Sequence, residues 1–389
     1  MESLKKVHKK GKIPIALVVP KYGLMGGAES VVFEMGERLA RMESLTVHVL
    51  AHRWKTGNAP IWFHKIPVVK FPRFLEPLSF AHFVDRWIRR HPDVLVHSHE
   101  RIHQMDLFTF HGIPHRTWIR EVRKKRMSLF DRATAWVEKR GMVNPRLANI
   151  LPVSSLVKEE VLRCYGIPES RIRIMHPGIA LERFTGLDRQ ACRKQVRARY
   201  DLASSDVVIL FLGMNFEIKR LDLVMKGMAH ALKRSPEIPW KLLVAGKGNL
   251  RKYRFLAKEL GIGDRVIFAG PVTPVEPYYL AADLFVMPSW MDTFGMAVLE
   301  AMAAGLPVII SQKVGARDLI TTGENGFVLS GHPSPEEMGG VLERLSEPHL
   351  RKSIGEMAQK KASEQSWDKV LEELVHIYIS TGWPWDKIR

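Results

Sequence analysis

Ile15-Ala16-Leu17-Val18-Val19 decides the fold of the first part of the chain. The run is continuous, apolar and β-branched, as is typical of a strand buried on both faces of a parallel sheet. It is followed by a turn with the glycines Gly23, Gly26 and Gly27. Apolar residues then recur at helical spacing at Val32, Met35 and Leu39. This order predicts a strand, a turn and a helix.

The same scheme repeats along the chain. Further strands are expected at 46–51, 94–99, 107–111, 149–153 and 172–175, and in the second half at 207–212, 241–245, 266–269, 284–287, 307–311 and 326–329. Helical patterns fill most of the gaps, and strands that alternate with helices form parallel sheets. The sequence therefore predicts an α/β protein with two doubly wound, Rossmann-like sheets.

Length and composition fit a soluble protein with two domains or one large domain. The 389 residues are 46% hydrophobic and 26% charged, and 59 Lys and Arg against 41 Asp and Glu give a net charge of +18. This excess predicts an anionic partner. The only cysteines are Cys164 and Cys192, too few for a four-thiolate zinc site or a disulfide framework.

Nothing in the sequence predicts a membrane span. The basic segment 1–12 precedes an apolar stretch, 13–20, that is too short to cross a bilayer. A glycine-rich turn follows it where a signal peptide would have a cleavage site. We expect a cytoplasmic protein that rests on a surface.

The pattern predicts an N-terminal domain at 1–180, with a basic insertion at 115–146, and a C-terminal domain at 181–366. Segment 186–205 is polar and supports this boundary. The tail 367–389 carries an apolar helical face that must pack on something, and the first domain is one candidate.

Two loops carry candidate chemistry. In 23–29, Gly26 and Gly27 would let backbone amides approach an anion at a helix N-terminus, although a plain tight turn also explains them. In 291–307, a strand leads through Gly295 into a helix with Glu300. Amides at 295–297 could hold a phosphate, and Asp292 and Glu300 could face one cleft. The alternative is that neither acid binds a ligand: Asp292 is then an ordinary acid at a helix N-terminus, and Glu300 is a solvated side chain.

Residues 292–308 read Asp-Thr-Phe-Gly-Met-Ala-Val-Leu-Glu-Ala-Met-Ala-Ala-Gly-Leu-Pro-Val, which resembles the two-acid signature of the retaining GT-B glycosyltransferases of family 4. Other segments resemble the same family at 176–179, 213–220, 244–248, 269–272 and 279–289. The layout is most similar to the lipopolysaccharide core glucosyltransferases, through Lys21-Tyr22, a strand ending near His111 and the basic insertion.

The resemblance implies a nucleotide diphosphate sugar bound in a cleft between two domains. It implies that Lys219 contacts the donor diphosphate, that Glu300 binds the nucleotide ribose, and that Asp292 contacts the donor sugar. The family's first acid is normally Glu, whereas this chain has Asp292. Met214 stands where many members have Arg, so Lys219 and Arg220 are the cations left to contact the diphosphate. The full set of implied donor-binding residues is Gly27, Gly213, Lys219, Arg220, Gly246, Val272, Phe294, Gly295, Met296, Ala297 and Glu300.

The family also has a histidine after a first-domain strand, and His111 matches it. The resemblance places it near the donor sugar, whereas a structural histidine at a strand end is the alternative. His111, Lys219 and Asp292 are thus the expected catalytic residues. No two aspartates lie two positions apart, so no Asp-x-Asp metal site is present, and we expect neither a metal nor a cofactor.

Segment 115–146 is basic and contains aromatic residues. We expect its cations Arg116, Arg120, Arg123, Lys124, Lys125 and Arg126 to bind an anionic membrane surface or acceptor, with Trp118, Ile119 and Val122 on one helical side. A solvated helix packed on its own domain is the alternative. Nucleic acid is not expected, because no recognition motif is present.

Together these features predict a retaining hexosyltransferase, with UDP-glucose as donor and a lipid-linked glycan such as lipopolysaccharide core as acceptor, on the inner face of the cytoplasmic membrane. A GT-B epimerase or a synthase with a soluble acceptor is one alternative. A non-catalytic nucleotide-sugar or glycan-binding protein is another.

Overall fold

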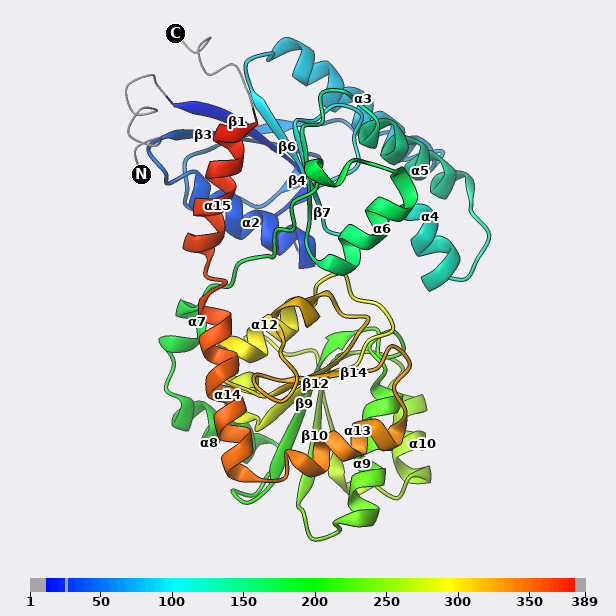
Figure 1. Cartoon of the computed structure of the whole chain (residues 1–389), viewed down its shortest axis with the longest axis vertical. Coiled ribbons are helices and arrows are strands. Elements are labelled where there is room, and N and C mark those ends of the chain that lie inside the picture. Colours follow the sequence, from blue (N-terminus) through cyan, green and yellow to red (C-terminus); the bar gives the residue numbers. More distant parts are fainter. Residues whose placement is uncertain (1–11, 25–26, 382–389) are drawn as a thin grey trace. The chain divides into compact units, whose positions relative to one another are not determined.

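The structure is a computed structural model that describes residues 12–24 and 27–381 (Figure 1). The chain divides into two compact units: a first unit of Met1–Gly178 with Trp367–Arg389, and a second unit of Ile179–Ser366. Each unit contains one six-stranded parallel sheet, so the predicted α/β class with two Rossmann-like sheets is confirmed. The basic N-terminal segment, together with Met25 and Gly26 of the glycine loop, lies outside the described residues.

The sheet of the first unit has the order β5-β3-β1-β6-β7-β8. Its strands are β1 (Ile13–Val18), β3 (Leu45–Ala51), β5 (Ile61–Lys65), β6 (Leu95–Ser98), β7 (Leu107–Phe110) and β8 (Asn149–Pro152). The apolar run that predicted β1 is buried throughout, with Ile15 and Leu17 fully inaccessible. Strand order reverses between β1 and β6, and ligands of such sheets bind at the carboxyl ends beside the reversal.

The sheet of the second unit has the order β11-β10-β9-β12-β13-β14. Its strands are β9 (Val207–Met214), β10 (Trp240–Lys247), β11 (Val266–Gly270), β12 (Leu284–Met287), β13 (Val308–Ser311) and β14 (Phe327–Leu329). Helices α9, α10 and α13 pack on the face that carries Ile209 and Phe211. On the other face, Tyr279 of α11 contacts Phe285 of β12. The order reverses between β9 and β12.

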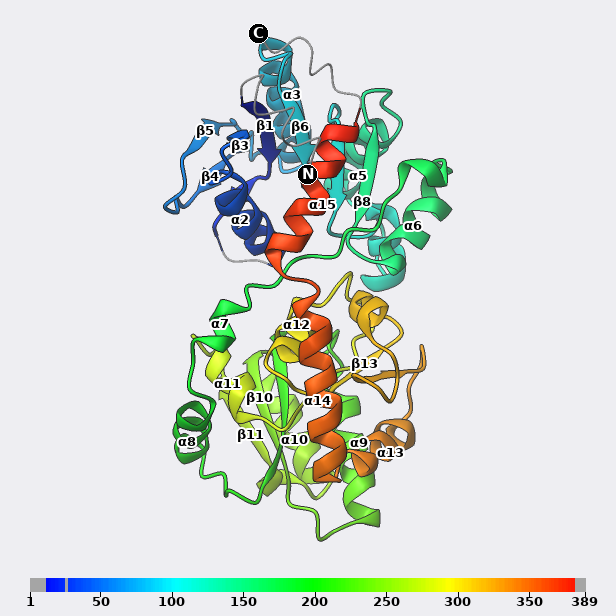
Figure 2. The ribbon, with the colours of Figure 1, turned by 60° about the vertical axis from the view of Figure 1, so that its left-hand side comes forward.

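The helices begin where the sequence supplies caps. Ser128, Ser154, Asp188, Asn249 and Ser334 each accept a backbone N–H of the first turn, as N-cap residues do. The helices of the first unit are α2 (Gly27–Leu39), α3 (Leu75–Arg90), α4 (His115–Thr117), a π-helical turn η1 (Trp118–Val122), α5 (Leu129–Met142), α6 (Ser155–Tyr165), a 3-10 turn η2 (Glu169–Arg171) and α15 (Trp367–Ser380). Those of the second unit are α7 (Glu182–Thr185), α8 (Arg189–Arg199), α9 (Leu221–Arg234), α10 (Leu250–Glu259), η3 (Gly263–Arg265), α11 (Glu276–Ala281), α12 (Met296–Ala303), η4 (Gly315–Leu319), α13 (Pro335–Arg344) and α14 (Pro348–Ser363). Figure 2 shows α14 beside α12, against which it packs.

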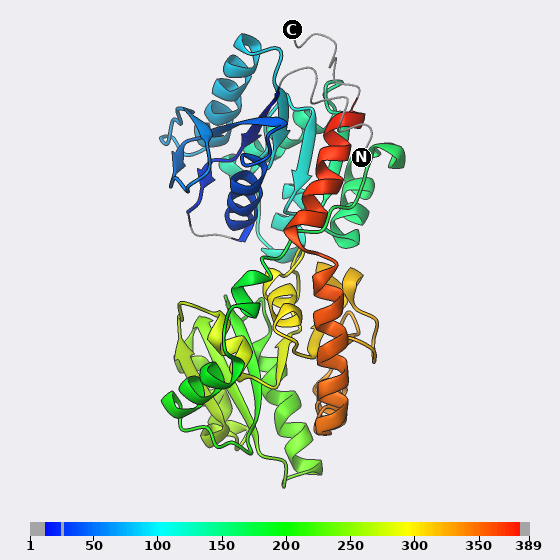
Figure 3. The same cartoon turned by 90° about the vertical axis from the view of Figure 1, so that its left-hand side faces the viewer.

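Helix α15 belongs to the first unit, although it follows the second unit in sequence (Figure 3). Its face formed by Leu371, Leu374 and Tyr378 is buried, and the helix contacts α2. The Tyr378 hydroxyl lies 2.7 Å from Nδ1 of His97 on β6, inside the core of this unit. The tail therefore contributes both apolar packing and a buried hydrogen bond.

The structure differs from the predicted strands at three places. Residues 172–175 do not form a strand: the amides of Arg173 and Met175 donate to Ile150 and Pro152 of β8, but only one bridge forms. Pro152 has no N–H to return a hydrogen bond, so the ladder stops there. The edge strand β5 and the small sheet of β2 (Lys21–Tyr22) with β4 (Arg53–Trp54) were not predicted, because these segments are short and half-polar.

Candidate functional site

The candidate site of the second unit lies at the carboxyl ends of β9 and β12, where the strand order reverses. The segments that follow the two strands are joined by a backbone hydrogen bond from Trp290 to Ile218, at 2.8 Å. Lys219 follows this contact on one segment and Asp292 follows it on the other. The fold therefore brings two of the three expected catalytic residues together.

Lys219 and Asp292 form an ion pair between Nζ and Oδ2. The other carboxylate oxygen of Asp292 accepts the amide of Phe294 at 3.3 Å. Both side chains remain partly accessible, with 19% and 18% of their surfaces exposed. A cation held in this way has a fixed position yet can still meet an anionic ligand.

Gly213 lies beside the aliphatic part of the Lys219 side chain. A Cβ atom at this position would lie 3.4 Å from Cγ of Lys219. Gly246 on β10 is more tightly constrained, since its φ is 125° and a Cβ would lie 1.8 Å from the carbonyl oxygen of Gly213. Gly246, one of the expected donor-binding glycines, thus allows the ends of β9 and β10 to approach each other.

Helix α12 begins at the same edge of the sheet. Gly295 is its N-cap, with φ of 93°, and a Cβ there would lie 2.8 Å from Cε of Met287. The amides of the first turn, at Met296 and Ala297, have no partner within the helix. They are donors that favour an anion at this end.

Glu300 projects from α12 into a buried cluster of polar side chains. Its Oε1 accepts from Nη1 of Arg183 at 3.2 Å, and its Oε2 accepts the hydroxyl of Tyr279 at 2.8 Å. Arg183 also donates to Glu276 at 2.6 Å. Burial raises the pKa of the Glu300 carboxyl, and Arg183 and Tyr279 counteract part of that rise.

Sequence reasoning missed Arg183 and Tyr279, which orient Glu300. Arg183 is separated from Glu300 by 117 positions and lies in the four-residue helix α7, so no local pattern indicated it. Each Glu300 oxygen accepts one hydrogen bond from these partners, and a carboxylate oxygen has two lone pairs. The group therefore retains capacity to accept ligand hydroxyls.

The other expected donor-binding residues are more dispersed. Arg220 stacks over Trp290, with Cζ 4.2 Å from the ring centre, and Met214 is 58% exposed at the end of β9. Val272 is half-buried in the loop after β11. Gly27 begins α2 in the first unit. Trp290, the partner of Arg220, was not singled out from the sequence.

His111 lies in the first unit, directly after β7, in a row of three histidines. Its Nε2 is 2.9 Å from Nδ1 of His99, and Nε2 of the neighbouring His97 is 2.7 Å from the Thr109 hydroxyl. Burial lowers the pKa of His111 to about 4 and that of His97 to about 3. The imidazoles are therefore neutral near pH 7, which suits hydrogen bonding rather than charge pairing.

The basic segment of the first unit is not one helix. The six expected surface cations are exposed, but residues 123–128 are non-helical between η1 and α5, and Lys124 has a φ of 47°. Of the apolar residues expected on one helical side, Ile119 is buried while Trp118 and Val122 are half-buried. The segment is therefore two helical pieces joined by a non-helical stretch, and the predicted single amphipathic helix is wrong.

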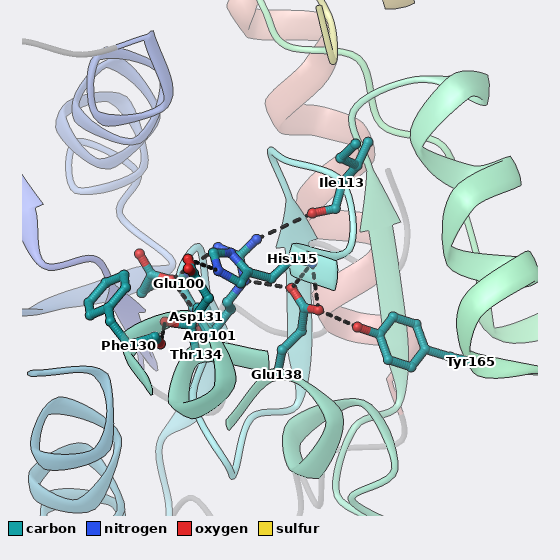
Figure 4. Close-up of polar contacts among 10 residues, drawn as sticks. Glu100, Arg101, Ile113, His115, Phe130, Asp131, Thr134, Glu138 and Tyr165 are labelled. Atoms are coloured by element: carbon teal, nitrogen blue, oxygen red, sulfur yellow. Dashed lines mark hydrogen bonds and ion pairs between the residues drawn. The ribbon is translucent and has the colours of Figure 1, made fainter. Parts of the chain in front are cut away.

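A buried polar network holds this segment in place (Figure 4). Asp131 at the start of α5 accepts from Ser128, from His115 at 3.1 Å and from Lys125 at 3.4 Å. Burial opposes ionisation, but these hydrogen bonds hold the pKa of the Asp131 carboxyl well below its usual range. The charge of Lys125 is therefore partly neutralised within the protein.

Glu138 is the second centre of the network (Figure 4). Its carboxylate accepts from Nε of Arg101 at 2.5 Å, from the backbone amide of His115 at 2.9 Å, and from the hydroxyl of Tyr165. Arg101 also donates to the carbonyl of Ile113 at 3.3 Å. The loops after β6 and β7 are thus tied to α5 and α6.

Two absences concern the described part of the chain. Within residues 12–24 and 27–381, no group of three or more His, Cys, Asp or Glu side chains is placed to hold a metal ion. No helix in those ranges is long and apolar enough to cross a bilayer. Metal independence remains a prediction.

Comparisons with known proteins agree with this architecture. Residues 193–361 match the family model described as Glycosyl transferases group 1, and residues 25–183 match Glycosyltransferase Family 4. The crystal structure of WaaG, a glycosyltransferase involved in lipopolysaccharide biosynthesis, is similar with a TM-score of 0.77 at 22% identity, covering 95% of this chain and 100% of that chain. The chain has the GT-B glycosyltransferase fold. The expected GT-B architecture is therefore confirmed.

Two further proteins are similar to this GT-B chain. HepE of Anabaena, in complex with UDP and glucose, has a TM-score of 0.71 at 15% identity and covers 95% of this chain and 100% of its own. The D-inositol 3-phosphate glycosyltransferase of Streptomyces bingchenggensis is 32% identical over 231 residues, which are 57% of this chain and 50% of the relative. The chain spans about half the length of the curated relatives that it matches.

Proposed function

We propose that the protein is a glycosyltransferase that moves a hexose from a nucleotide diphosphate sugar to an acceptor hydroxyl and retains the anomeric configuration. The observation that carries this proposal is the pairing of Lys219 with Asp292 beside the first turn of α12, at the strand reversal of the second sheet. A fixed cation and free helix amides suit a diphosphate. The two glycosyltransferase family matches support the same activity.

In the proposed reaction, the bond between the anomeric carbon and the diphosphate oxygen breaks, and a bond to the acceptor oxygen forms on the same face. The departing phosphate oxygen takes the acceptor proton. Lys219 and the amides of Met296 and Ala297 stabilise the negative charge that grows on the leaving group. Fixed charges and dipoles supply this stabilisation, so the proposal requires no metal ion.

UDP-glucose is the donor we favour. Glu300 would accept the ribose hydroxyls through the lone pairs that Arg183 and Tyr279 leave unused, and Asp292 would contact the hexose. The HepE complex with UDP and glucose supports this choice, because that protein shares the fold. His111 remains a predicted positioning group for the transfer.

For the acceptor, we propose a lipid-linked glycan such as lipopolysaccharide core, at the inner face of the cytoplasmic membrane. All six predicted surface cations are exposed, and Leu129 beside them exposes 66% of its surface. Cations and an apolar side chain on one segment suit an anionic membrane surface, where each cation adds about 1 kcal/mol at best. The fold shared with WaaG is consistent with such an acceptor.

A soluble phosphorylated acceptor is the second candidate, because the curated relatives are named D-inositol 3-phosphate glycosyltransferases. The test is release of nucleotide diphosphate from a panel of nucleotide sugars, with extracted lipid-linked glycans or with inositol phosphates, each with and without chelator. Release that depends on one acceptor class identifies it. Conversion of the sugar without an acceptor would indicate an epimerase. Tight UDP binding without turnover would indicate a non-catalytic binding protein. Loss of activity in chelator would indicate a metal-dependent enzyme.

Membrane binding is measured separately by sedimentation with anionic and neutral vesicles. Arg123→Gln with Arg126→Gln is expected to weaken binding to anionic vesicles about tenfold at low salt. The matched control is Lys233→Gln with Lys360→Gln, which removes two exposed cations of the second unit. Equal binding by both double variants would contradict the membrane surface.

A further inference from the structure

A cavity of about 430 Å³ lies in the second unit, at the opposite ends of the strands from Lys219 and Asp292. Ala282 and Asp283, just before β12, and Leu306 and Pro307, just before β13, line its base. Helices α8 and α14 supply its walls. Its volume is within the range of small-molecule sites, and its position at the amino ends of the strands separates it from the candidate donor site.

Cations predominate in the cavity wall. Its lining contains Arg189, Arg193, Arg351 and Lys352 against two acids, Asp283 and Glu356. Asp283 is already engaged by three donors: Arg193 reaches Oδ1 at 2.9 Å, while Arg197 at 2.8 Å and the Val208 amide at 2.7 Å reach Oδ2. The charged groups of Lys352 and Glu356 are exposed and 4.0 Å apart, so their ion pair stabilises the protein little.

Arg189 and Arg351 have only neutral acceptors among the residues described. Arg189 donates to the carbonyls of Ala304 and Leu280, and Arg351 donates to those of Leu345 and Ser346 at 2.6 Å. Each guanidinium has five N–H donors, so several remain for a ligand. Burial lowers the pKa of both groups and Arg193 adds to this effect, while Asp283 raises the pKa of both and Glu347 also raises that of Arg351.

We propose that this cavity binds a compact anion that carries phosphate groups, as a second ligand site distinct from the donor site. Arginine matches phosphate oxygens with two parallel hydrogen bonds, and three arginines meet here. The first turn of α14, which begins at Pro348 on the cavity wall, adds a favourable dipole. Such an anion would add to Asp283 in offsetting the mutual repulsion of the cations in this cavity. This proposal is independent of the transferase reaction.

The test is calorimetric titration of inorganic pyrophosphate into the full chain that carries Lys219→Ala. This background weakens binding at the donor site, so the binding that remains reports the cavity. Adding Arg351→Gln with Lys352→Gln is expected to weaken the remaining binding at least tenfold. The matched control adds Lys233→Gln with Lys258→Gln, exposed cations on α9 and α10, and is expected to change it less than twofold.

Arg351 also bonds backbone carbonyls, so a second variant guards against misfolding. Lys352→Glu places the opposite charge on a side chain that is 78% exposed, and it is expected to weaken binding at least threefold with an unchanged melting temperature. A parallel titration with hexose 6-phosphate distinguishes two kinds of ligand. If the site takes a sugar phosphate, hexose 6-phosphate binds more tightly than pyrophosphate; if it takes a free phosphate, it does not. Loss of all pyrophosphate binding in Lys219→Ala alone, or equal effects of the two double variants, would overturn the proposal.

Discussion

The ammonium group of Lys219 pairs with the carboxylate of Asp292 across 73 positions of sequence. The pair exists because β9 and β12 are neighbours in the sheet, and their following segments share a backbone hydrogen bond. Without a ligand, each side chain neutralises the other. A diphosphate would compete with Asp292 for Lys219, and this competition allows the two residues to be tested in opposite directions.

Lys219→Ala is expected to weaken UDP binding about tenfold or more, because a charge-assisted hydrogen bond is worth about 1.5–3 kcal/mol. Asp292→Asn is expected to leave UDP binding unchanged or tighter, because it frees Lys219, while it lowers turnover. Calorimetry with UDP and a turnover assay measure the two effects. Lys226→Ala on the exposed face of α9 is the control. Equal weakening of UDP binding by both variants would refute this division of roles.

Glu300 gives a second prediction, which concerns orientation rather than charge. Tyr279→Phe keeps the ring and removes the hydroxyl that bonds Oε2, so the carboxylate loses one of its two fixed partners. We expect UDP binding to weaken about threefold to tenfold, with a similar loss in Glu300→Gln. The control Tyr200→Phe removes a hydroxyl that, within residues 12–24 and 27–381, bonds only to Tyr278. If Tyr279→Phe binds UDP as tightly as the control, Glu300 does not depend on this orientation.

Sequence patterns predicted the sheets because their strands are continuous apolar runs, such as Ile15 to Val19 and Val207 to Leu212. Pairing with a distant partner was not predictable. Arg183 reaches Glu300 only after α7 packs on α11, and Trp290 meets Arg220 only after β9 and β12 align. Similarly, Ile172 to Met175 has strand composition, but Pro152 on the neighbouring strand cannot complete the ladder. Local composition specifies an element, whereas tertiary contacts specify its partner.

Gly246 provides a prediction for backbone geometry. Gly246→Ala would place Cβ 1.8 Å from the Gly213 carbonyl oxygen at a φ of 125°, so the ends of β9 and β10 must separate. We expect a loss of about 2–4 kcal/mol in the free energy of unfolding of the second unit, since strained non-glycine residues and overpacking each cost about 1–3 kcal/mol. Thermal and denaturant unfolding measure this loss. Gly263→Ala, whose Cβ would meet nothing within 4 Å, is expected to stay within about 0.5 kcal/mol of the parent, and an equal loss in both would refute the role of the clash.

The histidines of the first unit predict how stability depends on pH. The pKa values of His97 and His111 are lowered to about 3 and about 4, so below pH 6.5 the unfolded chain takes up protons before the folded chain does. The contribution of these histidines to the free energy of unfolding should therefore be fully present above pH 6.5. It should fall by about 1.4 kcal/mol per pH unit for each histidine between pH 6.5 and 4. Urea unfolding at pH 7 and pH 5 measures the slope. His111→Gln should reduce this dependence on pH, whereas His82→Gln, on the exposed face of α3, should not. An unchanged dependence in His111→Gln would show that His111 is already protonated in the folded protein at pH 5.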